Sequence, residues 1–580
     1  MIPYINVPFD YVANLVGAPT DELKMIFLFL ISYPLAGVLK RLPDHKPWTK
    51  NVFIISISIF YLVGLFDLWS GLALIVFDAV GAYLIAKYVE GPYMPWIGFS
   101  FLMGHMSISH IYRQMAATPS SVDITGAQMV MVMKLSAFCW NVFDGRQKAS
   151  ELNDDQKERM IVDLPAPLDF AGFVAFFPSI MIGPAFDYID YHRWLNTSMF
   201  DLPPGTDPMK APPTRKKRKI PRSATPAMWK MASGLLWVFA FLQFSNYFNK
   251  DVVLSDRYKN MGLLWRIFHL HMLSLVTRMK YYGAWSLTDG ACTLSGIGYK
   301  GLDAKTGKPN WDRLINVRPA GVEFGQNSHA YLGNWNINTN HWLRNYMYLR
   351  VTPKGKKPGF RASMATFVTS AFWHGFYPGY YLTFVLASFI QNVAKSTSSP
   401  HPQLRVPQLT NPADSRRLLR PFFMTPDNKP LPRKRYYDLL TWLVTQLTFS
   451  FCTAPFILLT IHDSMLVWSR VYFYCPVGVA LCSLFLASPG KAWLAGKAGA
   501  RSGKGGKPGL GRTDSMDSLK GGSTLGVPSE PGREFDELVE EIMVEVKMRR
   551  GSRAGPEGVE LRRRVEASLV EKSEEMKKEL

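Results

Sequence analysis

Cysteines are few in this 580-residue chain, and their spacing excludes two kinds of stabilising site. The five occur singly, in or beside apolar segments, at Cys139, Cys292, Cys452, Cys475 and Cys482. None shows the paired spacing of a disulfide framework or a zinc site. Motifs for phosphate-binding loops, HExxH metal centres and GxSxG nucleophiles are also missing. We therefore expect no bound metal and no resident cofactor.

The sequence also shows no cleavable signal peptide and no internal repeat. The first apolar block follows an acidic segment with Asp10, Asp21 and Glu22, and it lacks a small-residue cleavage site. We expect this block to stay in the mature protein as a membrane span. A transporter built from inverted repeats would show two similar halves with paired broken helices, and neither is visible.

Long apolar runs are abundant, since the chain is 48% hydrophobic and 13% aromatic. A bilayer span needs about 20 largely apolar residues. Spans are predicted at 25–39, 52–69, 72–89, 96–112, 129–142, 170–182, 229–248, 263–279, 380–393, 439–459 and 466–486. We expect an all-α polytopic membrane protein with about 11 transmembrane helices, several of them broken or tilted around an internal cavity. Segments 285–299 and 367–376 are too short or polar to assign and are candidates for re-entrant helices.

Basic clusters between the apolar runs supply most of the net charge of +21. Their place beside apolar spans favours the positive-inside rule over nucleic-acid binding, so no nucleic-acid partner is expected. The loop after the first span carries Lys40, Arg41, Lys46 and Lys50, whereas the N-terminus is acidic. This asymmetry predicts a lumenal N-terminus and, with an odd number of spans, a cytosolic C-terminus.

His374 is the strongest candidate for chemistry. It lies in an apolar stretch, and an ionisable group at membrane depth is costly enough to be a functional candidate by default. Gly375 and the Pro378-Gly379 step follow it, which predicts a backbone break with room for a substrate. A neutral imidazole can accept a hydroxyl proton and accelerate a reaction by roughly 10²- to 10⁴-fold. The alternative is a histidine hydrogen-bonded to a neighbouring carbonyl, the character expected of His105, His110, His269 and His271.

Four asparagines precede this histidine, at positions 334, 336, 338 and 340. An amide aimed at a developing oxyanion is worth roughly 10²–10³ in rate. If residues 334–349 form one helix, Asn336 and Asn340 share a face, while Asn338 points about 200° away. The alternative for any one of them is a helix cap or a contact between helices.

Two motifs around these residues resemble those of the membrane-bound O-acyltransferase family, and within it the fungal-type lysophospholipid acyltransferases. They are Trp-Asn-Ile-Asn-Thr-Asn-His-Trp-Leu at 335–343 and Ser-Ala-Phe-Trp-His-Gly-Phe-Tyr-Pro-Gly-Tyr-Tyr at 370–381, with support from 177–188 and 295–299. The likeness covers about residues 20–490. It implies many tilted helices around a central reaction chamber, which acyl-CoA enters from the cytosol and a lysophospholipid enters from the bilayer.

The resemblance maps the family's histidine onto His374 and its polar partner onto Asn336, with Asn338 in reserve. It implies that His374 takes a proton from the acceptor hydroxyl, which then attacks the thioester of acyl-CoA. Further candidates for substrate contacts are Trp335, Trp373, Tyr380, Glu323, Lys354, Lys356, Lys357 and Arg361. The basic four are candidates for contacts with CoA phosphates, with positive-inside charge as the alternative.

Three regions are expected along the chain. Residues 1–22 form the lumenal N-terminus and residues 23–487 the transmembrane catalytic domain, which contains the basic loops 202–226 and 396–434. Residues 488–580 form a basic cytosolic tail, partly disordered and partly helical.

The tail carries two further patterns. Apolar residues at helical spacing between 535 and 546 predict an amphipathic or self-associating helix, with a solvated tail as the alternative. The last four residues, Lys577-Lys578-Glu579-Leu580, match a cytosolic dilysine retrieval signal and also resemble the lumenal KDEL type. Both patterns predict the endoplasmic reticulum membrane.

Several alternatives stay open at the level of the sequence. The acceptor could be diacylglycerol, a sterol or a protein, and a transporter with His374 in its path is a rival of another class. Head-group preference, acyl-chain preference, the glycerol position and oligomeric state, including a homodimer, are not encoded in any pattern that we can identify.

Overall fold

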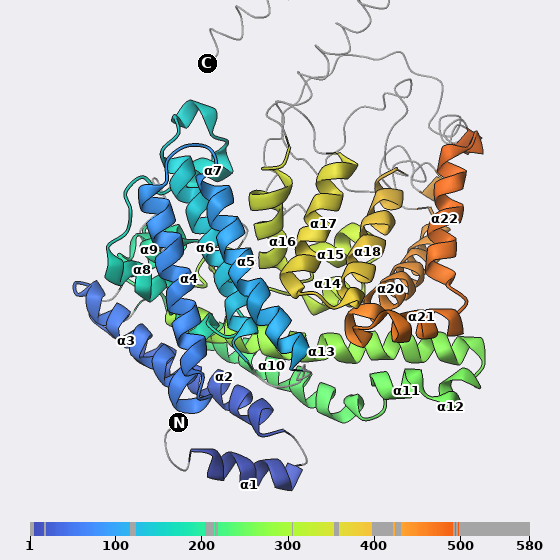
Figure 1. Ribbon diagram of the computed structural model, residues 1–580, viewed down its shortest axis with the longest axis horizontal. Coiled ribbons are helices and arrows are strands. Elements are labelled where there is room, and N and C mark those ends of the chain that lie inside the picture. The colour runs from blue at the N-terminus through green and yellow to red at the C-terminus, as the bar shows by residue number, and fades with distance from the viewer. Residues whose placement is uncertain are drawn as a thin grey trace, which may run out of the picture. The chain divides into compact units, whose positions relative to one another are not determined.

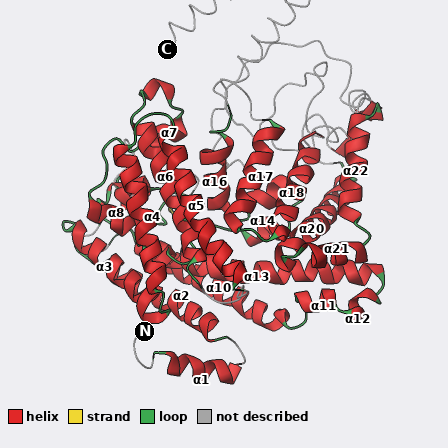
Figure 2. Ribbon diagram, viewed as in Figure 1, coloured by secondary structure: helices red, strands yellow, loops and turns green. Residues whose placement is uncertain are grey.

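The computed structural model describes residues 5–16, 19–116, 123–202, 214, 219–303, 306–352, 359–396, 422–423, 431–490, 493–494 and 497. All of them belong to one compact unit. Helices dominate these residues (Figure 2), and a short antiparallel pair, β1 (Gly301–Leu302) and β2 (Pro309–Asn310), accompanies them. The predicted helical fold class is confirmed. The tail patterns after residue 498 lie outside the described residues.

The helices follow one another along the chain as shown in Figure 1. They are α1 (Asn6–Val16), α2 (Thr20–Leu39), α3 (Pro47–Ile59), α4 (Trp69–Tyr88), α5 (Met94–Met115), α6 (Thr125–Gly145), α7 (Asp154–Arg159), α8 (Pro167–Val174), α9 (Tyr188–Leu195), α10 (Ala224–Ser245), α11 (Lys250–Leu254), α12 (Asp256–Lys259), α13 (Leu263–Ser295), α14 (Pro319–Glu323), α15 (Ser328–Gly333), α16 (Ile337–Leu343), α17 (Phe360–His374), α18 (Pro378–Ser396), α20 (Lys434–Leu458), α21 (Ile461–Arg470) and α22 (Tyr474–Ala487). Two π-helical turns extend α3 (Phe60–Leu65) and α16 (Arg344–Tyr348).

Within the described residues, five helices are long and apolar enough to cross a membrane. They are Thr20–Leu39, Pro47–Leu65, Trp69–Tyr88, Ala224–Leu254 and Lys434–Leu458, and α21 with α22, bent by 77°, makes a sixth if it counts as one broken span. The chain is therefore a multi-pass membrane protein. The count of about 11 spans stays a prediction.

Two assignments made from the sequence differ from the structure. The predicted span at 170–182 is wrong as a single helix, because α8 ends at Val174 and a short 3₁₀ turn, Phe177–Ser179, follows. The 8 residues of α8 rise about 12 Å, well short of the roughly 30 Å hydrocarbon core. Segment 285–299, a candidate re-entrant helix, instead belongs largely to α13, a continuous helix of 33 residues.

Helix α6 lies in the interior, beside α4, α5 and α16 (Figure 1). Its side chains are buried continuously from Val130 to Val142. A helix that is apolar almost all round is usually enclosed by protein or lipid, and here protein encloses it. This central position lets α6 contact several of the segments that carry the sequence motifs.

Candidate active site

His374 is the last residue of α17, and the backbone leaves the helical conformation at the next residue. Gly375 adopts φ +119° and ψ −161°, a conformation that is essentially restricted to glycine. The imidazole lies among the rings of Tyr380, Phe384 and Phe456, with centroid separations of 5.7, 5.3 and 4.9 Å. With the described residues it makes no hydrogen bond, so its ring nitrogens are not committed to another protein group.

Gly379 does not leave room for a substrate, although the sequence suggested such a space at the Pro378-Gly379 step. The Gly379 N–H donates to the Leu459 carbonyl at 2.8 Å, and a Cβ on Gly379 would lie 2.0 Å from the Pro455 carbonyl oxygen. The end of α20 therefore occupies the space beside this glycine. The step anchors α18 against α20.

The four asparagines have different surroundings. The predicted helix over 334–349 is wrong at its start, because α16 begins at Ile337 and Asn336 is its N-cap, with φ 45° and ψ 54°. Three amide groups donate to backbone carbonyls: Asn334 to Ala330 at 2.8 Å, Asn338 to Leu314 at 3.3 Å and Asn340 to Leu332 at 2.7 Å. The Asn336 side chain makes no hydrogen bond with any described residue. Of the four, it is the one whose amide is not used to hold neighbouring backbone.

Three contacts align α16 and its π-helical extension with α6. The Thr339 hydroxyl donates to the Met133 sulfur at 3.2 Å, and Trp342 Nε1 donates to the Ser136 hydroxyl at 2.9 Å. Further along, the Tyr346 hydroxyl donates to Asn141 Oδ1 at 3.0 Å. The residue numbers rise together on both helices, so the two run parallel. Three residues before Thr339, the same register brings Asn336 to the level of Val130, the residue after Met129.

The end of α17 reaches the same level of α6. Trp373 Nε1 donates to the Met129 carbonyl at 3.0 Å, and the Trp373 and Trp342 ring centroids are 6.0 Å apart. Since His374 is the next residue, α6 brings the two ends that carry Asn336 and His374 together. Figure 1 shows α16 and α17 as neighbours close to α5 and α6.

Aromatic rings pack beside each of the two candidate residues. Trp335, the residue before Asn336, packs against Tyr281 and Trp285 on α13, with centroid separations of 5.7 and 5.0 Å. Tyr380 packs against His374, with a centroid separation of 5.7 Å. Sequence reasoning missed Tyr281, because a tyrosine in an apolar helix carries no distinctive signal.

Two other predicted substrate contacts are engaged with protein groups. Glu323 accepts two hydrogen bonds from Arg278, at 2.8 and 2.7 Å, and a third from the Tyr282 hydroxyl at 2.6 Å. Trp373 is only 5% exposed, and its indole N–H is used by Met129. Both side chains hold the surrounding helices together.

One of the four basic candidates is placed by the structure, and it lies far from the histidine. Arg361 is exposed in the first turn of α17, which places it about 20 Å along the helix from His374. Lys354, Lys356 and Lys357 fall outside the described residues. Among the residues that the structure places, no group of three or more His, Cys, Asp or Glu side chains could hold a metal ion.

Two segments that are distant in sequence meet at Tyr346, in the π-helical extension of α16. The Tyr346 hydroxyl bonds Asn141, near the end of α6, and Asp187, the N-cap residue of α9, at 3.0 Å each. Burial raises the pKa of the Asp187 carboxyl, although Arg159, with its Nε 3.4 Å away, opposes the shift. The two hydrogen bonds of Tyr346 hold the C-terminal end of the segment formed by α16 and its π-helical extension, which begins just after Asn336.

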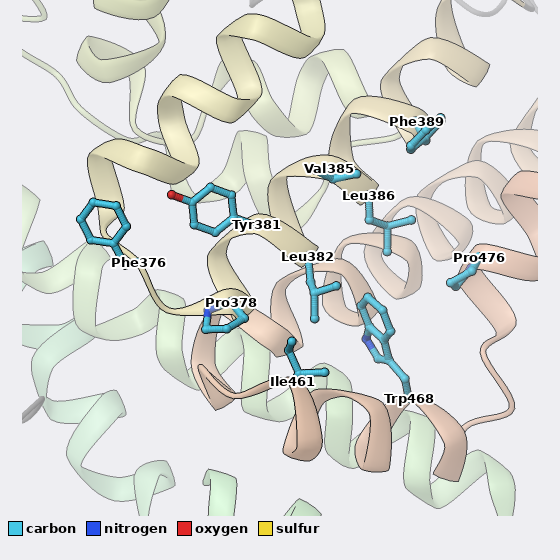
Figure 3. Close-up of a pocket in the computed structure, with 10 residues that line it drawn as sticks. All are labelled: Phe376, Pro378, Tyr381, Leu382, Val385, Leu386, Phe389, Ile461, Trp468 and Pro476. Carbon is cyan, nitrogen blue, oxygen red and sulfur yellow. The ribbon is translucent and has the colours of Figure 1, made fainter. Parts of the chain in front are cut away.

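An apolar groove of about 560 Å³ lies at the α17–α18 turn, on the side away from His374 (Figure 3). Its walls include Phe376, Pro378, Leu382, Leu386, Phe389 and Trp468. Tyr380 and Phe384 contact His374, so α18 separates the histidine from the groove. The lining suits a hydrocarbon chain rather than a charged group.

Comparison with known proteins covers both motifs. The sequence profile of the membrane-bound O-acyltransferase family matches residues 110–412, which include Asn336 and His374. A lysophospholipid acyltransferase of Schizosaccharomyces pombe is 43% identical over 494 residues, which are 85% of this chain and 91% of that protein. A lysophospholipid acyltransferase of Saccharomyces cerevisiae is 39% identical over 482 residues, 82% of this chain and 75% of that protein.

Proposed function

The chain belongs to the membrane-bound O-acyltransferase family, and we propose that it is a lysophospholipid acyltransferase that uses acyl-CoA as its donor. The two yeast relatives carry the name lysophospholipid acyltransferase and cover more than four fifths of this chain. The observation that supports the chemistry is that neither the His374 imidazole nor the Asn336 amide makes a hydrogen bond with any described residue, while the end of α17 and the start of α16 both lie against α6.

In the proposed reaction, His374 takes the proton from the free glycerol hydroxyl of the lysophospholipid. The hydroxyl oxygen attacks the thioester carbonyl carbon of acyl-CoA and forms a tetrahedral intermediate. The carbon–sulfur bond then breaks, and the CoA sulfur leaves with the proton that the imidazolium returns. No acyl-enzyme is needed, because both substrates meet in one chamber. General-base help of this kind contributes roughly 10²- to 10⁴-fold.

Asn336 is the proposed donor to the oxygen that gains negative charge on the thioester carbonyl. Its amide is not committed to the protein, which supports this role over that of Asn338, whose amide donates to the Leu314 carbonyl. The left-handed backbone at Asn336 suits asparagine better than most residues. Trp335 and Tyr380 would then form aromatic walls beside the reacting groups.

The remaining proposed substrate contacts lie near the two ends of α17. Arg361, with Lys354, Lys356 and Lys357 just before it in sequence, would meet the CoA phosphates at the cytosolic side. The acyl tail of the acceptor would enter from the bilayer through the groove at Phe376 and Leu382. Glu323 and Trp373 would act by holding the chamber walls.

The proposed location is the endoplasmic reticulum membrane, with about 11 spans, a lumenal N-terminus and a cytosolic C-terminus. The charge asymmetry around the first span and the C-terminal lysines support this topology. The residue ranges 1–22, 23–487 and 488–580 keep their proposed roles as N-terminus, catalytic domain and tail. A homodimer stays a proposal.

The test uses microsomes from cells that lack the endogenous activity and express the wild type or His374→Ala at matched abundance. They receive labelled oleoyl-CoA and a panel of lysophospholipids, with diacylglycerol and sterol as other acceptors. Incorporation into phospholipid by the wild type alone would support the proposal. Full activity of the variant would refute the role of His374, and activity restricted to diacylglycerol or sterol would refute the acceptor.

A further inference from the structure

His110 on α5 is a second buried histidine beside the candidate base. It is 6% exposed, and its Nε2 lies 3.1 Å from the Trp373 carbonyl oxygen. A carbonyl can only accept a hydrogen bond, so Nε2 carries the hydrogen. The expectation that His110 bonds a carbonyl is confirmed, but the sequence could not show which carbonyl. The same expectation is wrong for His105, which bonds the Asp78 carboxylate, and for His271, which bonds the Ser450 hydroxyl.

The carbonyl that His110 binds lies at the end of α17. The last four carbonyls of a helix have no partner within the helix and need one from elsewhere. The Gly375 N–H bonds the carbonyls of Ala371 and Phe372, at 3.2 and 3.1 Å. His110 supplies the partner for Trp373, the next carbonyl. The final turn of α17 is thus closed by a side chain that comes from 263 residues earlier in the chain.

The same imidazole also touches the residue after His374. A Cβ built on Gly375 would lie 3.1 Å from His110 Nδ1 and 3.2 Å from its Cγ. A side chain at this position would have to push His110 away by a few tenths of an ångström, and the φ of +119° is also strained for any residue but glycine. His110 therefore contacts both neighbours of His374, through a hydrogen bond on one side and van der Waals contact on the other.

These contacts matter because the His374 side chain makes no hydrogen bond with any residue that the structure describes, so no such bond orients it. Its direction depends on the backbone at 373–375 and on packing against aromatic rings. We propose that His110 is a positioning residue that sets the orientation of the His374 imidazole by fixing the residues on either side of it. This inference rests on the proposed role of His374 as the base.

The test compares His110→Leu, which removes the donor, with His110→Gln, whose amide nitrogen can replace Nε2. Rates are measured per folded enzyme at saturating oleoyl-CoA and lysophospholipid. A displacement of about 1 Å costs on the order of 10²-fold, so His110→Leu should lower kcat about 10²-fold. Both KM values should stay within about twofold of wild type, since substrate contacts are unchanged. His110→Gln should recover most of the loss.

His105→Leu is the matched control. His105 lies on the same helix, and its Nδ1 bonds the Asp78 carboxylate on α4 at 2.6 Å. Its removal should lower the amount of folded protein but not kcat per folded molecule. If His110→Leu does not accumulate, His110→Asn replaces it, because that amide is too short to reach Trp373. Unchanged kcat in the donor-free variant, or equal losses in His110→Gln, would overturn the proposal.

A double-mutant cycle separates this inference from the proposed function. If His110 acts through His374, then His110→Leu should cause no further loss in a His374→Ala background. A multiplied loss would show that His110 acts independently and would overturn the inference alone. An active His374→Ala single variant would instead refute the proposed mechanism.

Discussion

The ion pair between Arg278 and Glu323 offers the sharpest test of whether Glu323 stabilises the fold or binds substrate. The sequence predicts that Glu323 contacts substrate, whereas the structure surrounds its carboxylate with Arg278 and Tyr282. The side chains of the two ion-pair partners are only 6% and 18% exposed. Glu323→Gln keeps the size and one acceptor oxygen but leaves the Arg278 guanidinium without a counter-charge.

The expected loss is large for one substitution. Breaking a buried, hydrogen-bonded ion pair by removing one partner costs about 3–5 kcal/mol. A domain is typically stable by about 5–15 kcal/mol, so Glu323→Gln should remove a substantial fraction of the free energy of unfolding. Replacing both partners, with Arg278→Met and Glu323→Leu, removes the uncompensated charge and should restore part of that stability.

The assay follows thermal unfolding of purified protein in detergent, together with kcat and both KM values per folded molecule. We expect a lower Tm in Glu323→Gln, near-normal kinetics of the surviving folded enzyme and partial recovery of Tm in the double variant. An unchanged Tm with a raised KM or a reduced kcat would refute this reasoning. Glu323 would then contact substrate, as its sequence motif suggested.

Three further predictions address the site and the groove. Asn336→Ala should lower kcat roughly 10²–10³-fold without loss of folded protein, and equal activity of Asn336→Ala and wild type in the labelled oleoyl-CoA assay would exclude an oxyanion role. Gly379→Ala should sharply reduce the amount of folded protein, because the alanine Cβ would lie 2.0 Å from the Pro455 carbonyl oxygen. Size-exclusion chromatography measures this amount, and a normal yield of folded protein would contradict that packing. Leu386→Trp should fill the groove and raise the KM for lysophospholipid but not for acyl-CoA, and equal changes in both KM values would speak against a separate acceptor path.

The two residues that we propose as catalytic could be singled out from the sequence because their motifs are local. His374 stands out as an ionisable group in an apolar stretch, and Asn336 follows Trp335 in a distinctive asparagine-rich run. The choice between Asn336 and Asn338 was not accessible, because it depends on where α16 begins. The helical spacing argument assumes a regular helix through all four asparagines. Asn336 instead lies in the left-handed N-cap, and this changes which side-chain amide makes no hydrogen bond with the described residues.

Other errors arose where a local pattern competes with packing. The run at 170–182 is apolar enough to span a membrane, yet Pro178 removes a backbone donor and a 3₁₀ turn forms there. The space expected beside Gly379 is filled by α20, which lies about 75 residues later in the chain. Neither outcome is visible in hydropathy, because the first depends on the backbone chemistry of a proline and the second on which distant helix packs against the segment.

The convergence of Asn336 and His374 depends on helix α6, and the kind of contact at each level affects how the site responds to substitution. Ser136 and Asn141 accept hydrogen bonds through their side chains, so a change at either position removes the acceptor for Trp342 or Tyr346. At the level of the histidine, Trp373 instead binds the backbone carbonyl of Met129, which is present whatever the side chain. On the side of α17 that faces α5, the side chain of His110 is the hydrogen-bonding contact. We infer that the end of α17 tolerates substitution at Met129 but not at His110, although each of these residues makes one hydrogen bond with Trp373.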